Sequence, residues 1–357
     1  MARLIDPEKA LKVQDIYIDS VGVYVPEVVR SADAVAQGLY DAQMHEEAEL
    51  DGVAVSPGIS GPDMAVLAAR QAFDRATLTR PDVDVVFHSS CFHEGPDAWC
   101  AQNYVQLKAV GEATGRGVPA FEVRQGCNGM FAAFELAVCY LRAAGERRSA
   151  LVTIGDNMES PLMDRWRSVP FQLIGDAGAA AVLTKRGGFA RLRAVDSLLV
   201  QELEGLHRGA EPLFPPPATT RVPVDLAARS AAFFAGQEFG EFNRLNLQGL
   251  HGLVDRLTED AGVKLQDIAR VSYMSVSRDF TEQRLMVPLG LPMEKSCWEY
   301  AKGVGHLGSS DHLAAFDHLL GTGALVPGDL MLMIGLAPGL SVSGAVVEIV
   351  DTPPWLA

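Results

Sequence analysis

This sequence lacks a long apolar run, an excess of basic residues and paired cysteines, and each absence excludes a class of protein. The apolar stretches of the 357-residue chain are interrupted by charge, so none of them is predicted to span a membrane. With 30 basic and 45 acidic residues, the net charge of −15 disfavours binding to nucleic acid or to an anionic lipid surface. The opening segment, MARLIDPEKALKVQD, is charged where a signal peptide has its apolar core, so we expect a cytoplasmic protein.

The five cysteines are odd in number and none of them is spaced as CxxC, which argues against a disulfide framework or a zinc site. They are Cys91, Cys100, Cys127, Cys139 and Cys297. We therefore expect free thiols and no bound metal. A lone cysteine is most often a buried structural residue, and this is our interpretation of every cysteine except Cys127.

Strand-like and helical segments alternate along the chain, which predicts an α/β fold with buried sheets. Strands rich in β-branched residues are predicted at 16–25, 83–87, 150–154, 179–183, 271–275, 330–334 and 345–350. Helices are predicted at 63–76, 128–144, 247–261 and 309–320. The proline-rich stretch at 209–223 is interpreted as a surface loop or lid.

The two halves of the chain resemble each other weakly, which predicts two duplicated domains, residues 1–187 and residues 188–357. The segment ALVTIGD in the first half is similar to LMLMIGL in the second, and each is followed by small residues and a final strand. From Cys127 to Gly155 is 28 residues, and from His306 to Gly335 is 29. A pseudo-twofold relation between the halves would bring the cysteine and the histidine together.

Cys127 lies in the segment RQGCNGM, between a β-like run and a long apolar helix. Gly126 and Gly129 permit a tight turn there and the close approach of another chain or a ligand. The dipole at a helix N-terminus stabilises a thiolate, and cysteines so placed can have pKa values of about 3.5–7.5. This strand-to-helix elbow favours Cys127 as a nucleophile.

Several segments together resemble the ketosynthase III enzymes of the thiolase superfamily. They are RQGCNGM, SALVTIGDNM, LIGDAGAAAVLTKRGG and the run that begins GHLGSSDHLAAFDHLL. The resemblance implies the thiolase fold, in which two similar halves build five α-β-α-β-α layers, normally in a homodimer. It also implies that Cys127 holds an acyl group as a thioester. The substrate would be an acyl thioester of phosphopantetheine, and no bound cofactor is expected.

Two positions depart from the pattern of the condensing members of this family. Those members place a histidine after the strand predicted at 271–275 and an asparagine before the helix predicted at 309–320. Here Ser275 and His306 stand at these positions. The pair of donors that holds the thioester carbonyl of the extender during decarboxylation is therefore missing, which argues against carbon–carbon condensation.

His306 and Asp311 suggest a different arrangement with Cys127, in which His306 is the base and Asp311 fixes its tautomer. Asp311 lies in the first turn of the following helix, so its side chain could point back towards the imidazole. This Cys-His-Asp pattern resembles a group of ketosynthase III-like acyltransferases in antibiotic pathways. Those enzymes move acyl groups between carrier proteins, coenzyme A and an acceptor.

Further residues are considered as auxiliary members of the site: Gly339, His207, Ser275 and His93. Ketosynthase III enzymes build an oxyanion hole from the N–H of the nucleophile and an N–H of a glycine-rich loop, which here reads LAPG and ends at Gly339. Pro338 in this loop has no N–H to donate. Because the loss of one such donor typically costs about 2.7–4 kcal/mol, we expect Gly339 or a side chain to replace it. His207 is considered for holding the acyl carbonyl, and His93 follows a strand end that lines the site in the family.

The acyl donor is left open between an acyl carrier protein and coenzyme A. Coenzyme A-using members carry arginine and tryptophan after the first helix, whereas residues 44–63 here are acidic and contain neither, which favours a carrier protein. The acceptor is left open among a hydroxyl, an amine and a carrier thiol. Two alternatives to acyl transfer also stay open, a condensing ketosynthase III with an altered site and a non-catalytic partner subunit.

Overall fold

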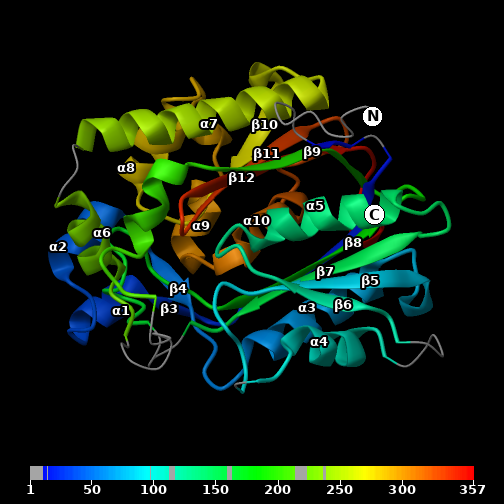
Figure 1. The fold of residues 1–357 in the computed structure, drawn as a ribbon, viewed down its shortest axis with the longest axis horizontal. Helices are drawn as coiled ribbons and strands as arrows, with labels where there is room; N and C mark the ends of the chain where they lie inside the picture. Colours follow the sequence, from blue (N-terminus) through cyan, green and yellow to red (C-terminus); the bar gives the residue numbers. More distant parts are fainter. Residues whose placement is uncertain are drawn as a thin grey trace.

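The chain folds into stacked layers in which helices and strands alternate from one face of the molecule to the other (Figure 1). The computed structural model describes residues 11–13, 15–96, 98–111, 117–158, 163–213, 223–235 and 239–357. Two layers of strands enclose a central pair of helices, and a further helical layer covers the outside of each strand layer. This is the α-β-α-β-α order that was predicted.

The strands of both layers follow one hydrogen-bonded path, β10-β11-β12-β9-β2-β8-β7-β5-β6, with β1 paired to β9. Their bounds are β1 (Leu11–Lys12), β2 (Tyr17–Tyr24), β5 (Val83–Ser89), β6 (Ala120–Val123), β7 (Ser149–Asp156), β8 (Ala177–Thr184), β9 (Ala190–Leu199), β10 (Ile268–Ser272), β11 (Leu330–Ala337) and β12 (Ser341–Ile349). Between β2 and β9 the register joins Tyr17 and Ile18 to the start of β9. At this short junction the path passes from one strand layer to the other.

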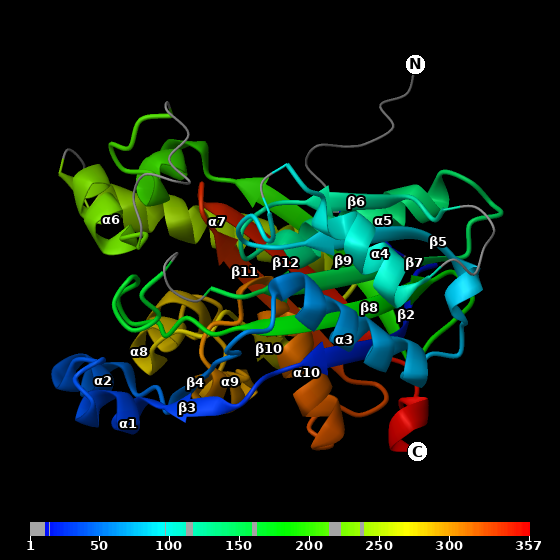
Figure 2. The ribbon, with the colours of Figure 1, turned by 90° about the horizontal axis from the view of Figure 1, so that it is seen from below.

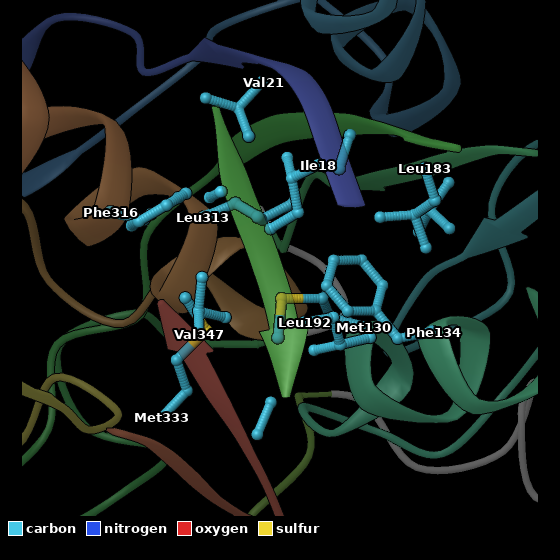
Figure 3. Close-up of a cluster of buried hydrophobic side chains, with 14 of the residues drawn as sticks. Ile18, Val21, Met130, Phe134, Leu183, Leu192, Leu313, Phe316, Met333 and Val347 are labelled. Carbon is cyan, nitrogen blue, oxygen red and sulfur yellow. The ribbon is translucent and has the colours of Figure 1, made fainter. Parts of the chain in front are cut away.

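The central layer consists of α5 (Gly129–Arg142) and α10 (Asp311–Gly321), which pack against strands of both layers. α5 contacts β5 and β7 on one side and β9 and β12 on the other, while α10 contacts β2, β8 and β10. Figure 3 shows Met130 and Phe134 of α5 and Phe316 of α10 in the apolar cluster between the sheets. Each such side chain contributes about 1.5–3 kcal/mol by its burial, which explains why most residues of these helices are apolar.

The outer layers are α3 (Gly61–Arg75) and α4 (Ala101–Ala109) on one strand layer and α7 (Phe239–Ala261) on the other (Figure 1). Figure 2 shows α1 (Ser31–Ala36) and α2 (Ala42–Ala48) beyond the layers, at the end of the molecule where β3 (Val28–Arg30) pairs with β4 (Gly52–Ala54). The remaining α-helices of the described part are α6 (Leu226–Phe234), α8 (Arg278–Thr281) and α9 (Trp298–Val304).

Helix α3 lies directly on the backbone of three strands because glycine occupies each contact. These are Gly22 on β2, Gly155 on β7 and Gly178 on β8. A Cβ atom at Gly155 would overlap the carbonyl group of Gly61, and one at Gly178 would overlap that of Met64. The helix thereby fixes the end of β7, where Asp156 follows Gly155.

Most predicted elements are confirmed, with changes at their ends. The helix predicted at 247–261 begins at Phe239, and the strand predicted at 271–275 lies at Ile268–Ser272 instead, so Ser275 falls beyond its end. Most of the predicted lid at 209–223 lies outside the described residues, which omit 214–222. No helix of the described part is long and apolar enough to cross a membrane. The division into domains at residues 187 and 188 stays a prediction.

A substitution at Gly178 tests the close contact between α3 and the sheet. Gly178→Ala places a methyl group against the backbone of Met64, and such overpacking typically costs about 1–3 kcal/mol. We expect chemical denaturation to show a loss of this size in the free energy of unfolding. The control is Gly145→Ala, since a Cβ at Gly145 meets no atom within 4 Å. Equal stability of the two variants would contradict this packing.

Candidate active site

Cys127 lies in the turn between β6 and α5, with Asn128 as the N-cap of the helix. The turn depends on Gly126, whose φ of 51° lies in the left-handed region that favours glycine. A Cβ at Gly126 would also lie 2.8 Å from Cδ of Pro338, so a larger residue would collide with the turn between β11 and β12. The predicted elbow is therefore present, and glycine is required there both for the turn and for the contact.

His306 follows α9 and is held through its backbone. Its N–H donates to the carbonyl of Leu173 over 2.7 Å, and its carbonyl accepts from the N–H of Gly175 over 2.8 Å. Gly305, just before the histidine, has a φ of 74°. The imidazole is thus positioned by backbone hydrogen bonds, and its side chain is buried, with 4% of its surface exposed.

The side chains of Cys127, His306 and Asp311 form one continuous chain. The Cys127 Sγ lies 3.0 Å from Nε2 of His306, and Nδ1 of His306 lies 2.5 Å from Oδ2 of Asp311. Asp311 is the first residue of α10 and is 6% exposed. Its carboxylate also accepts from the N–H of Leu307 over 2.7 Å and from that of Ser275 over 3.3 Å. These two backbone bonds orient the carboxylate towards the ring.

The charges of this group stabilise one another. A hydrogen bond from the Cys91 thiol lowers the pKa of Cys127 well below its ordinary value, and His306 lowers it further through its charge and its hydrogen bond, against the effect of burial. Burial disfavours a charged ring at His306, yet the charges of Asp311 and Cys127 raise the pKa of this histidine well above its ordinary value. Both directions favour a thiolate paired with an imidazolium.

Cys91 is a member of the site that the sequence analysis interpreted as structural. Its Sγ lies 3.9 Å from the Sγ of Cys127. Its N–H donates to Oδ1 of Asp156 over 2.6 Å. The contact depends on the pairing of β5 and β7 as parallel neighbours, because the carboxyl ends of parallel strands meet at the same edge of a sheet. Cys91 and Asp156 lie at those two ends.

Asp156 is a buried carboxyl group beside the two cysteines. Within the described part of the chain, its Oδ2 has no hydrogen-bond partner. Burial raises the pKa of Asp156 to about 7, against the N–H of Cys91, which lowers it. Burial, followed by the charge of Asp156, raises the pKa of Glu94 to about 8. Near neutral pH, Asp156 is therefore about half ionised and Glu94 is mostly protonated.

Ser309 joins the two helix starts that meet at the site. Its hydroxyl donates to the carbonyl of Gly126 over 2.7 Å and accepts from the N–H of Gly129 over 3.2 Å. One side chain from the segment before α10 thus bonds to the backbone on both sides of Cys127. This contact holds the cysteine at a fixed distance from His306.

Of the auxiliary residues predicted, Ser275 and His93 point elsewhere. The hydroxyl of Ser275 donates to the carbonyl of Ala301 over 2.8 Å, so only the backbone of Ser275 contributes, through Asp311. His93 is exposed, and its Nε2 lies 3.2 Å from the carbonyl of Pro96 in its own loop.

His207 and Gly339 remain predictions as site residues. His207 is partly buried at the end of a 3-10 helix, and its Nδ1 has no hydrogen-bond partner among the described residues. Burial lowers the pKa of this histidine, and the charge of Cys127 raises it. Gly339 lies in the turn between β11 and β12 with a φ of 81°.

The lowered pKa of Cys127 is tested by the pH dependence of its alkylation. The pKa of a cysteine thiol in water is about 8.5. The rate at which iodoacetamide alkylates Cys127 should instead stay near its plateau at neutral pH and fall only in acid. His306→Ala removes the positive charge and the hydrogen bond, so its profile should move to higher pH. Peptide mass spectrometry measures the rates, with the exposed Cys139 as the internal reference. Coincident profiles for Cys127 and Cys139 would refute the shift.

Comparisons with known proteins identify the family. The family model described as 3-oxoacyl-[acyl-carrier-protein (ACP)] synthase III matches residues 121–197. The model for the C-terminal part of these enzymes matches residues 258–349. The first match contains Cys127, and the second contains His306 and Asp311.

Relatives extend the match over nearly the whole chain. Beta-ketoacyl-[acyl-carrier-protein] synthase III 3 of Streptomyces coelicolor is 30% identical over 286 residues, which are 78% of this chain and 80% of that protein. The solved structure of ChlB3, described as an acyltransferase, is 44% identical with a TM-score of 0.89 and covers 96% of this chain and 100% of its own. A 3-oxoacyl-(acyl carrier protein) synthase III from Pseudomonas aeruginosa, 20% identical with a TM-score of 0.75 over 96% of this chain and 100% of its own, supports the fold alone. The predicted thiolase fold is confirmed, and the chain belongs to the ketosynthase III-like family of the thiolase superfamily.

Proposed function

We propose that this protein is an acyltransferase that moves an acyl group from a phosphopantetheine thioester, through a thioester on Cys127, to a hydroxyl, amine or thiol acceptor. The observation that carries the proposal is the continuous chain of Cys127, His306 and Asp311, with separations of 3.0 Å and 2.5 Å. A nucleophile, a base and a group that orients the base are the parts that two-step acyl transfer requires.

In the first step the Cys127 thiolate attacks the carbonyl carbon of the donor thioester. The tetrahedral intermediate collapses, the bond to the pantetheine sulfur breaks, and the leaving thiolate takes the proton of the His306 imidazolium. The oxyanion of the intermediate lies at the N-terminal end of α5, where the helix dipole and the N–H of Cys127 stabilise negative charge.

In the second step the acceptor attacks the acyl group on Cys127. Neutral His306 takes the proton of the acceptor at Nε2, and the Cys127 thiolate leaves. Asp311 keeps the other proton of the ring on Nδ1 and stabilises the imidazolium that forms. The enzyme is thereby returned to the thiolate–imidazolium state in which it began.

Decarboxylative condensation is the second candidate, because several relatives are named as synthases, including one from Mycobacterium marinum that is 26% identical over 353 residues. The geometry favours transfer. Condensing members use a histidine and an asparagine to hold the carbonyl of the extender, whereas the Ser275 hydroxyl is bonded to Ala301 and His306 is bonded to Cys127 and Asp311. A non-catalytic partner subunit would have no need of a thiolate-stabilising elbow.

The proposed donor is an acyl carrier protein, with coenzyme A as the alternative. Several relatives carry the acyl carrier protein in their names, and the acidic segment that includes α2 offers no arginine or tryptophan for an adenine nucleotide. An acidic carrier protein would need a basic docking patch on this acidic chain, and Arg165 is not available for one, because it is buried in an ion pair with Asp176. We further propose a cytoplasmic homodimer in a secondary-metabolite pathway such as antibiotic biosynthesis.

Intact-protein mass spectrometry tests the first step. Incubation with a panel of acyl thioesters of pantetheine should add one acyl group to the wild-type protein and none to Cys127→Ala. Peptide mapping should place the group on Cys127, because this thiolate is the strongest nucleophile of the site. Malonyl donors should acylate without loss of carbon dioxide. Release of carbon dioxide with a condensed product would favour the synthase instead.

The role of His306 is tested in the second step. His306→Ala should slow transfer from the isolated acyl-enzyme to a hydroxyl or amine acceptor by about 10²–10⁴-fold, the usual contribution of a positioned base. His251→Ala, on the exposed face of α7, is the matched control and should transfer at the wild-type rate. Unchanged transfer in the His306 variant would refute its role as the base.

A further inference from the structure

We propose that Cys91 and Cys127 form a peroxide-sensitive thiol pair, which closes a disulfide that blocks the nucleophile and which a dithiol reopens. The disulfide is inferred from the closeness of the two sulfur atoms, and only its effect on acyl transfer rests on the proposed function. In the acyl transfer steps the Cys91 thiol acts only through its hydrogen bond to Cys127.

The two sulfur atoms are already neighbours. They lie 3.9 Å apart, while the bond length in a disulfide is about 2.0 Å, so rotation of the side chains must bring them about 2 Å closer. Cys91 and Cys127 are each partly exposed as whole residues, although both thiol groups are desolvated, so we take a small oxidant, hydrogen peroxide, as the probe. Among the other cysteines, Cys100 and Cys139 are exposed and Cys297 is buried.

The two thiols differ in acidity. One must be the thiolate that reacts with peroxide, and the other must be the thiol that then joins it in the disulfide, here called the resolving thiol. Cys127 is the stronger nucleophile, because Cys91 and His306 both stabilise its anion. Cys91 stays protonated, because its hydrogen bond to Cys127, followed by burial, raises the pKa of the Cys91 thiol well above its ordinary value. A peroxide therefore reacts at Cys127 first.

The reaction balances with hydrogen peroxide as the oxidant. The Cys127 thiolate attacks one oxygen, the O–O bond breaks, and Cys127 becomes a sulfenic acid while the leaving hydroxide takes a proton from His306. The Cys91 sulfur then attacks the Cys127 sulfur, the S–O bond breaks, and the second hydroxide leaves as water. Two thiols are oxidised by two electrons in total, and one peroxide is reduced to two water molecules.

Asp156 is placed to take the proton of Cys91 in the second step. Its Oδ1 holds the Cys91 N–H over 2.6 Å, and its Oδ2 is buried without a partner among the described residues. Gly308 allows both groups to approach, because a Cβ there would lie 2.7 Å from the Asp156 Oδ2 and 2.9 Å from the Cys91 Sγ. The carboxylate and the thiol therefore share the space against the backbone of Gly308.

The test is treatment of the whole protein with one equivalent of hydrogen peroxide. The intact mass of the wild type should fall by two hydrogens, and peptide mapping should find Cys91 joined to Cys127. Acylation of Cys127 should be lost, and dithiothreitol should restore both the mass and the acylation. Cys139→Ser, which removes an exposed thiol of α5, is the matched control and should behave as the wild type does.

Removal of the resolving thiol should convert a reversible change into an irreversible one. With Cys91→Ala, an excess of hydrogen peroxide, one molecule for each oxygen added, should convert Cys127 to the sulfinic or sulfonic acid, and dithiothreitol should restore little of the variant's own initial acylation. The wild type in the same excess should still close the disulfide and recover. Cys91→Ser is nearly the same size as the native residue and replaces the alanine variant if that variant fails to fold.

Two outcomes would overturn the proposal. One is over-oxidation of Cys127 in the wild type without any Cys91–Cys127 peptide, and the other is equal recovery of wild type and Cys91→Ala. Both outcomes differ from the result expected if the proposed acyl transfer is wrong. A protein that never forms an acyl-enzyme but closes the disulfide would refute the proposed function and leave the thiol pair standing.

Discussion

The contact between the Cys127 sulfur and Nε2 of His306 is the interaction on which this site depends, because it joins residues 179 positions apart. It exists only because two helices, α5 and α10, begin at the same point between two layers of strands. Each helix buries apolar side chains against both layers, so neither can shift without losing core contacts. The packing that stabilises the central layer therefore also fixes the distance between the Cys127 sulfur and the His306 imidazole.

Individual contacts between neighbouring groups then set the distances within the site. Glycine at position 126 lets the elbow turn against Pro338, and Ser309 bonds the backbone on both sides of Cys127. The carboxylate of Asp311 is oriented by two backbone N–H groups before it meets the imidazole. Such fixed donors cost no reorganisation when charge moves during the reaction. The same closeness brings the Cys91 sulfur against that of Cys127, so in our proposal one contact both stabilises the thiolate and makes it sensitive to oxidants.

The sequence predicted the parts of the site that local pattern or family register encodes. Cys127 was predicted from its glycine-bounded turn before an apolar helix, and His306 and Asp311 were predicted from their register in the family; the three side chains lie in contact. Cys91 was missed because its partners Cys127 and Asp156 come from other segments, and only the parallel pairing of β5 with β7 brings these strand ends together. Ser275 was predicted as the last residue of a strand, but that strand ends at Ser272, so Ser275 lies in the loop before α8. Element type follows from periodicity, whereas strand ends depend on neighbours that the local sequence does not specify.

The protonation state of His306 tests the central claim most directly. NMR of the protein with ¹⁵N-labelled histidine can report both ring nitrogens at neutral pH. The account predicts that His306 carries protons on both Nδ1 and Nε2 in the resting enzyme, because Asp311 and the Cys127 thiolate surround it. A neutral ring with one unprotonated nitrogen at neutral pH, in a protein whose fold is intact, would contradict the thiolate–imidazolium pair.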